Sequence, residues 1–284
     1  MPLCFSHEGY KQPQEALVLA YFLALRQSFD LVVNIDGFND VALASLNNDR
    51  GLDISMPSVQ HLDPLISTVN QSALTPDKLD TLAAIFRDRR RMLDLQGTIA
   101  RNRSAAVHFV LDLNYGRLAD QYVRALGRFS TLPANPPENA FTQLASPTRA
   151  RDRETMFTDI AATWAQSSVV MHELLSARRV PYFHFLQPNQ YFGARRFADA
   201  ERTKVLNDAS PYKRSVEAGY PLLVAEGAAL RQRGVRFFDA TRALDGEPSP
   251  AYMDDCCHYT LAGNRTLADF VAASILSADV VRAP

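Results

Sequence analysis

The amino-acid sequence predicts an α/β fold built on a parallel β-sheet. Helical stretches alternate with short runs of β-branched and aromatic residues, and the clearest runs are "DLVVNID", "VPYFHFL" and "VRFFDAT". Such alternation is typical of a parallel sheet whose strands are buried between helices. Hydrophobic residues make up 47% of the 284 positions, which is enough apolar material for a sizeable core.

The first third of the chain predicts one helix and two strands. Residues 13–25 place apolar side chains at helical spacing, and Pro13 suits the first turn because its missing N–H has no partner there. The run at 31–36 reads as a buried strand, and "PLCF" at 2–5 reads as a short strand.

The middle of the chain predicts a long helical stretch from Thr75 to Phe129. Thr75 is a good N-cap residue and Pro76 suits the first helical position. A break near Gly97–Ser104 divides the stretch into two helices. The Pro-rich and polar segment at 130–150 predicts a surface loop.

The last part of the chain completes the alternation. It predicts an amphipathic helix over 156–175, a strand over 180–186, a helical pair over 198–233, a strand over 235–238 and a final helix over 260–276. We therefore expect residues 1–284 to form a single domain with a helical insertion at about 75–130.

Charge and composition narrow the range of partners. Lys plus Arg (30) nearly balances Asp plus Glu (31), so no net field attracts nucleic acid or an anionic surface. No apolar run reaches the roughly 18–20 residues of a membrane span, and the first residues lack the pattern of a signal peptide. We expect a small-molecule partner, no nucleic acid and no membrane span, while oligomeric state and localisation stay open.

Candidate site residues follow the predicted strands, because ligands bind at the carboxyl ends of parallel strands. Asp255 lies three positions before His258, so its carboxylate could orient the imidazole as a general base. The alternative is that Asp255 only caps the final helix. Asn39, beside Phe38 in "DGFND", could donate its amide to an oxyanion or could simply form a turn.

Two further groups of polar residues have competing interpretations. Gln187 and Asn189 in "QPNQY" are candidate substrate contacts, as is Phe38, although turn chemistry explains the two polar residues almost as well. His184 alternates with aromatic residues inside an apolar strand, which favours a hydrogen-bonded core histidine. Cys256 and Cys257 lack a second ligand cluster at zinc-like spacing, so the sequence predicts no metal and no cofactor.

Three of these motifs together resemble the SGNH hydrolase family, also called GDSL-type esterases and lipases. "GFND" resembles the family's Gly-x-Asn-Asp block, "DDCCH" its Asp-x-x-His block, and "GYKQPQ" the block whose glycine lines the oxyanion hole. With "FLQPNQY" and "CHYTLAGN" they resemble one bacterial subgroup. The resemblance implies a flavodoxin-like three-layer α/β/α sandwich and a serine esterase without cofactor, with His258 as base, Asp255 as its orienter, and Asn39 and Gly9 as oxyanion donors.

The resemblance also implies a nucleophile that the sequence does not match. The family's serine follows its first, central strand in a Gly-Asp-Ser or Gly-Gly-Ser turn, and neither tripeptide occurs here. We therefore expect an N-terminally truncated domain that lacks this strand, with Ser6 as the alternative nucleophile. The expected substrate is a small-molecule, glycan or lipid ester. The alternatives are a catalytically inactive member, or a flavodoxin-like ligand-binding domain.

Overall fold

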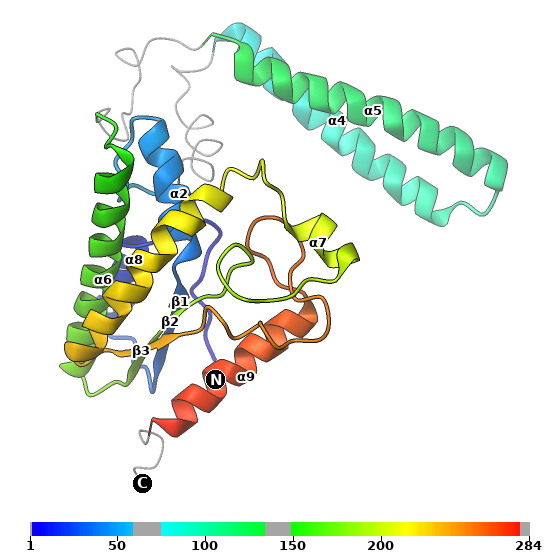
Figure 1. Ribbon diagram of the computed structural model, residues 1–284. Coiled ribbons are helices and arrows are strands. Elements are labelled where there is room, and N and C mark those ends of the chain that lie inside the picture. The colour runs from blue at the N-terminus through cyan, green and yellow to red at the C-terminus, as the bar shows by residue number, and fades with distance from the viewer. Residues whose placement is uncertain (1, 59–74, 134–148, 279–284) are drawn as a thin grey trace. The chain divides into compact units, whose positions relative to one another are not determined.

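The computed structural model describes residues 2–58, 75–133 and 149–278, and these form two compact units. Met1–Leu62 and Ser146–Pro284 belong to an α/β unit, and Asp63–Ala145 belong to a helical unit. Both units are drawn in Figure 1. No helix within the described ranges is both long and apolar enough to cross a membrane.

The α/β unit is built on a three-stranded parallel sheet in the order β1-β2-β3. Its strands are β1 (Val32–Asp36), β2 (Tyr182–Leu186) and β3 (Arg236–Asp239), which confirms the three strands predicted over these ranges. Asn34 of β1 aligns with His184 of β2, which in turn aligns with Phe237 of β3. The carboxyl ends of all three strands therefore meet at one edge of the sheet.

Helices cover both faces of this sheet (Figure 1). On one face α6 (Arg153–Ser176) and α8 (Lys213–Gln232) pack against each other and against β2. On the other face lies α9 (Leu261–Ser277), where the ring of Phe270 meets Phe185 of β2 at 6.4 Å. The mixed α/β fold with a parallel sheet is therefore confirmed.

Three shorter helices are the remaining helices among the described residues of the α/β unit. Helix α1 (Gln14–Ala24) packs on α6, and α7 (Asp199–Val205) precedes α8. Helix α2 (Phe38–Asp49) packs between α6 and α8, and the sequence did not predict it. Nine of its 12 residues are buried, and four of these nine are polar, so its polar and apolar residues do not separate into an exposed and a buried face that a sequence pattern would reveal.

Strand β1 lies at one edge of the sheet, and within the described residues no strand pairs with its outer side. Val33 and Ile35 remain 38% and 42% exposed. The predicted strand at 2–5 is wrong, because these residues form no regular secondary structure and pair with no strand. Instead Phe5 packs its ring on Phe22 of α1 at 4.3 Å, so apolar packing determines where this segment lies.

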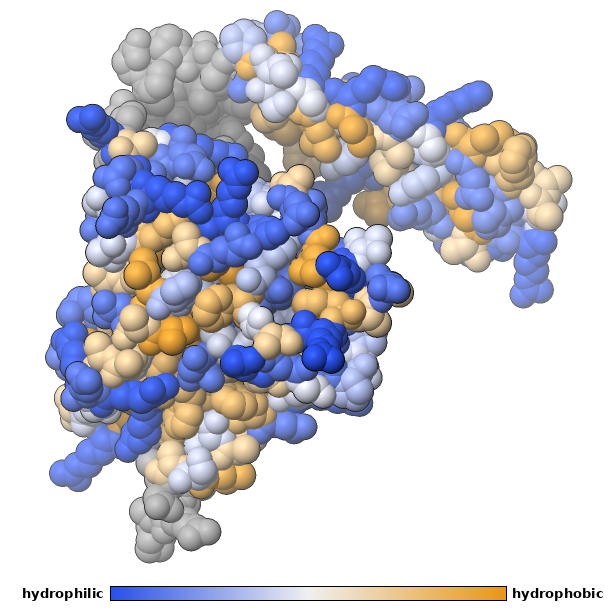
Figure 2. All heavy atoms as spheres, viewed as in Figure 1, coloured by the Kyte–Doolittle hydropathy of each residue, from blue (hydrophilic) through white to orange (hydrophobic). Residues whose placement is uncertain are grey.

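The helical unit is a hairpin of α4 (Pro76–Arg101) and α5 (Ala105–Thr131). Thr75 Oγ1 accepts a hydrogen bond from the Lys78 N–H at 3.3 Å, and this cap and the break between the helices agree with the sequence. Apolar side chains are exposed along the hairpin (Figure 2), among them Leu79, Phe86, Leu93, Val107, Phe109, Val110 and Leu113. Of the predicted loop at 130–150, residues 134–148 lie outside the described part.

Candidate functional site

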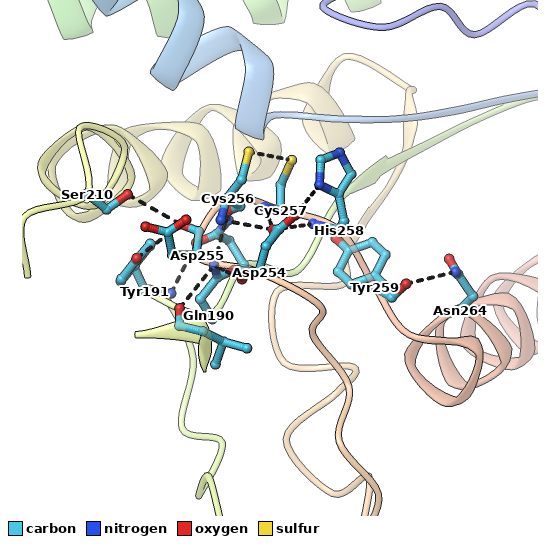
Figure 3. A network of polar contacts seen from close by, with 12 residues as sticks. Gln190, Tyr191, Ser210, Asp254, Asp255, Cys256, Cys257, His258, Tyr259 and Asn264 are labelled. Atoms are coloured by element: carbon cyan, nitrogen blue, oxygen red, sulfur yellow. Dashed lines mark hydrogen bonds and ion pairs between the residues drawn. The ribbon is translucent and has the colours of Figure 1, made fainter. Parts of the chain in front are cut away.

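The loop between β3 and α9 presents the best defined group of reactive side chains (Figure 3). Tyr252 and Tyr259 form an isolated antiparallel bridge, and the Met253 N–H donates to the His258 carbonyl at 2.8 Å. These contacts close the loop at its base. The residues between them, 254–258, are therefore held in one tight turn.

Asp254 organises this turn. Its Oδ1 accepts the backbone N–H groups of Cys256 and Cys257 at 3.0 and 3.2 Å, while Oδ2 lies 2.6 Å from Nδ1 of His258. Burial opposes ionisation, but these hydrogen bonds outweigh it and hold the pKa of Asp254 below its ordinary value. The carboxylate is therefore charged at neutral pH and fixes the imidazole with Nδ1–H as donor, leaving Nε2 as acceptor.

Asp255 does not contact the imidazole, contrary to the sequence prediction. Its Oδ2 accepts the side-chain amide of Asn207 at 2.8 Å, and its carbonyl accepts the hydroxyl of Tyr191 at 3.0 Å. Asp254, one residue earlier, instead accepts both the N–H groups of the turn and the imidazole contact. The carboxylate that orients His258 in this structure is therefore Asp254.

The loop after β2 braces the loop that carries His258, as the sequence predicted for strand ends at one rim. Gln187 Nε2 donates to the hydroxyl of Tyr259 at 3.3 Å, and Asn189 Nδ2 donates to the Cys256 carbonyl at 3.0 Å. Gln190 Nε2 donates to the Asp254 carbonyl at 3.1 Å. Asn189 is only 1% exposed, so its amide supports the turn in this structure; its role as a substrate contact stays a prediction.

A buried ion pair contacts the residues that precede the turn at 254–258. Arg195 Nη2 lies 2.9 Å from Glu201 Oε2, and both side chains are almost fully buried. Glu201 Oε1 also accepts the Ala251 N–H at 2.7 Å, just before the turn. Sequence reasoning missed this pair, because six residues of separation across a loop and a helix follow no periodic pattern.

The two predicted oxyanion donors lie in neighbouring segments. Asn39, in the first turn of α2, donates its Nδ2 to the carbonyl of Tyr10 at 2.7 Å, and Gly9 with φ 75° precedes Tyr10. The structure thus brings these segments together, but the Asn39 amide is engaged with the protein backbone. Phe38, a predicted substrate contact, is 1% exposed and packs its ring on Tyr212 at 5.5 Å.

Behind Asn39, buried ionisable side chains lie at the start of α2. Gly37, at φ 118°, adopts a backbone conformation that favours glycine, and its N–H donates to Asp40 Oδ2 at 3.2 Å. The Gln12 N–H donates to Asp40 Oδ1 at 2.8 Å. Burial, together with the nearby charge of Asp36, raises the pKa of Asp40 to about 7. Burial lowers the pKa of Lys11, which donates to the Ile54 carbonyl, to about 8.

A serine, a histidine and an aspartate form a second chain in the core. Ser168 Oγ lies 2.8 Å from His184 Nδ1, and His184 Nε2 lies 2.8 Å from Asp36 Oδ1. Trp164 Nε1 donates to the same Asp36 oxygen at 2.7 Å. Ser168 and His184 are fully buried, so this chain faces no substrate. The prediction of a hydrogen-bonded core histidine is confirmed.

The electrostatics of this core chain favour an ionised aspartate. Burial opposes the charge on Asp36, but His184, Glu15 and Trp164 contribute hydrogen bonds or charge that lower its pKa to about 2. Asn34 Nδ2 adds a further donor at 2.7 Å to Oδ2. The network therefore ties β1, β2 and α6 together through a single buried carboxylate.

No serine hydroxyl within the described ranges is hydrogen-bonded to His258. Ser6 Oγ contacts Cys4 Sγ at 2.9 Å on the exposed N-terminal segment. Ser210, which lies in the same network as His258, donates instead to the Asp255 carbonyl at 3.3 Å (Figure 3). The described residues therefore include an imidazole held by a carboxylate but no serine hydroxyl bonded to that imidazole.

Comparisons with protein-family models, with curated proteins and with solved structures found no match to this chain. The site is therefore interpreted from its own geometry. That geometry provides an imidazole whose Nδ1 is fixed by a carboxylate, on a braced loop at the carboxyl edge of a parallel sheet. Such a group can take up a proton from a nucleophile at Nε2.

Proposed function

We propose that this protein is a serine ester hydrolase of the SGNH type, acting on a carboxylic ester. The observation that carries the proposal is the hydrogen bond of 2.6 Å between Asp254 and His258. The side chain of His258 is 66% exposed, so the imidazole can meet a substrate. A carboxylate–imidazole pair in this arrangement is the acid and base part of a catalytic triad.

The proposed reaction has two steps. In the first, Nε2 of His258 takes the proton of a serine hydroxyl, the serine oxygen bonds to the ester carbonyl carbon, and protonated His258 returns the proton to the departing alcohol. In the second, water activated by His258 hydrolyses the acyl-serine to the acid. The oxyanion would be held by the Gly9 N–H and the Asn39 amide, once the latter leaves the Tyr10 carbonyl.

The proposal includes a larger, flavodoxin-like sheet in which a further strand lies at the outer side of β1 and leads to the nucleophilic serine. The outer side of β1, with which no described strand pairs, supports it, because an open edge of β-branched residues such as Val33 and Ile35 favours pairing with another strand. Ser6 is the alternative nucleophile.

The second candidate function is a catalytically inactive domain that binds a ligand at the same rim. Its support is the hydrogen bond of 2.7 Å from Asn39 to the Tyr10 carbonyl, which occupies the amide that an oxyanion would need. The hydroxyls of Ser6 and Ser210 also contact groups other than His258.

Hydrolysis of p-nitrophenyl acetate and labelling with a fluorophosphonate distinguish the two candidates. We expect one serine adduct, located by mass spectrometry, and a rate that falls by about 10²–10⁴-fold in His258→Ala and in Asp254→Asn. Asp255→Asn is the matched control, because the adjacent carboxylate contacts Asn207 rather than the imidazole. This variant should retain a rate close to that of the wild type.

Each result of this experiment has a defined meaning. An adduct on Ser6 would assign the nucleophile to the N-terminal segment, and its loss in Ser6→Ala would verify that assignment. A protein that forms no serine adduct, with a basal rate insensitive to His258→Ala, would overturn the esterase proposal in favour of the binding domain.

A further inference from the structure

The turn that holds His258 also brings two thiols together. Cys256 and Cys257 are both half-buried and unoxidised, and their Sγ atoms lie 3.1 Å apart (Figure 3). A disulfide would need a separation of about 2.0 Å, so the sulfurs are in contact without being bonded. One ligand atom from each of Cys256, Cys257 and His258 lies within 4.8 Å of the other two.

This donor set suits a soft, four-coordinate cation. Thiolate sulfur and imidazole nitrogen are the ligands that Zn²⁺ prefers, at about 2.3 Å for sulfur and about 2.0–2.1 Å for nitrogen. Two sulfurs bound to one tetrahedral Zn²⁺ lie about 3.8 Å apart by that geometry. Cys256 and Cys257 are closer than this, so small rotations about their side-chain bonds would be needed to admit the ion.

The surroundings of His258 resemble the supporting shell of a zinc ligand. A metal-bound histidine typically donates its other ring N–H to a carboxylate, which fixes the ring and raises its basicity. Asp254 provides that carboxylate on Nδ1 at 2.6 Å, which leaves Nε2 for the metal. This supporting carboxylate is a second observation, independent of the cysteines, that favours a metal ligand at His258.

The backbone of the turn is organised before any ion binds. Asp254 Oδ1 accepts the N–H groups of both cysteines, and Asn189 and Gln190 donate to the Cys256 carbonyl at 3.0 and 3.2 Å. Residues that are already held in place lose little conformational entropy when they bind an ion. The exposed imidazole leaves solvent access for the fourth ligand, a water molecule.

We propose that Cys256, Cys257 and His258 bind one Zn²⁺ ion, with Asp254 supporting the histidine and water as the fourth ligand. Binding converts two thiols to thiolates and releases two protons, while neutral His258 donates its Nε2 lone pair. The inference goes beyond the proposed esterase and does not rest on it. If the esterase proposal also holds, Zn²⁺ and catalysis compete for Nε2, and the ion inhibits the reaction.

The proton balance gives the site a distinctive pH dependence. Cysteine binds Zn²⁺ as the thiolate, whereas an ordinary cysteine thiol carries its proton at neutral pH. Zn²⁺ must therefore displace thiol protons at neutral pH, and its affinity rises with pH. Release of two protons corresponds to an increase of up to about 100-fold in affinity per pH unit.

The experiment uses the whole protein, isothermal titration with Zn²⁺, and Co²⁺ as a spectroscopic substitute. We expect one Zn²⁺ per chain and sulfur-to-cobalt charge-transfer absorption. Both should be lost in Cys256→Ser and Cys257→Ser, and affinity should fall about 10–100-fold in Asp254→Asn because the supporting carboxylate is removed. Cys4→Ser is the matched control, since Cys4 is an exposed thiol whose Sγ contacts Ser6.

The outcomes separate this proposal from its rivals. A wild-type protein without thiolate–cobalt absorption overturns it, whether or not the variants fold. Binding that survives in both turn variants, or that disappears in Cys4→Ser, assigns the ion to other residues and also overturns it. Circular dichroism of each variant verifies folding, and esterase activity is not used as a readout, so failure of one proposal leaves the other distinguishable.

Discussion

Replacing Gly227 by alanine should destabilise the α/β unit even though alanine is the better helix former. Gly227 lies in α8 against β3, and an added Cβ would overlap Cε1 and Cζ of Phe237 and approach its Cδ1 to 2.7 Å. The ring has little room to retreat. Its centroid already lies 5.7 Å from that of Trp164 and 5.5 Å from that of His184.

The expected free energy follows from two opposing contributions. An overlap with three ring atoms belongs at the upper end of the cost of overpacking, about 3 kcal/mol. Replacing glycine by alanine inside a helix stabilises the helix by about 1 kcal/mol. The net loss in the free energy of unfolding for Gly227→Ala is therefore about 2 kcal/mol, and the packing against Phe237 determines its sign.

Urea unfolding followed by far-UV circular dichroism measures this loss. Gly116→Ala is the matched control, because Gly116 is also helical but a Cβ there meets nothing within 4 Å, so its helix should gain about 1 kcal/mol. Phe237→Leu in the Gly227→Ala background should recover part of the loss, since leucine lacks the outer ring atoms. A Gly227→Ala variant at least as stable as the wild type would refute the reasoning.

Three further predictions concern the buried charges. Trp164→Phe removes a donor at 2.7 Å from charged Asp36 and should cost about 1.5–3 kcal/mol at pH 7, measured by urea unfolding; a loss below about 0.5 kcal/mol would contradict it. The pKa of Asp36, about 2 in the folded protein against an ordinary 3.8, is lowered by folding. Stability is therefore present above about pH 4 and should fall by about 2 kcal/mol as the pH drops towards 2, less steeply in Trp164→Phe. The pKa of Asp40 is raised to about 7 by folding. Between about pH 4 and 7 the folded state therefore holds a proton that the unfolded state has already released. As the pH rises from 5 to 8, the difference in the free energy of unfolding between Asp40→Asn and the wild type should shift in favour of the variant by on the order of 2 kcal/mol. A difference that does not change with pH would argue against a buried neutral carboxyl.

The strands could be predicted from the sequence because their residue types match their burial in the sheet. Phe183 and Phe185 alternate with His184 in a run buried on both faces, which is the composition of a central parallel strand. Helix α2 could not be found in the same way, because it is buried on nearly all sides. The segment at 2–5 has the composition of a strand, but pairing also needs a neighbour, which composition does not reveal.

At the site, the sequence predicted which loop carries the reactive side chains, but not which of its two aspartates contacts His258. Asp254 and Asp255 are adjacent carboxylates, and both are close enough in sequence to reach His258. The choice between them depends on the folded path of the loop, in which Asp254 lies 2.6 Å from the imidazole while Asp255 accepts from Asn207. The sequence predicted no metal at the proposed zinc ligands, because it was judged by ligand spacing alone. Spacing along the chain does not show a supporting carboxylate or contact between neighbouring sulfurs.

The burial of Trp164 provides an optical probe for the α/β unit alone. The sequence contains one tryptophan, which lies fully buried in the α/β unit beside Asp36 and His184. Its fluorescence therefore follows the unfolding of that unit, whereas far-UV ellipticity also includes α4 and α5. Coincident transitions by the two signals would mean that both units unfold as one cooperative system, and separated transitions would give each unit its own stability.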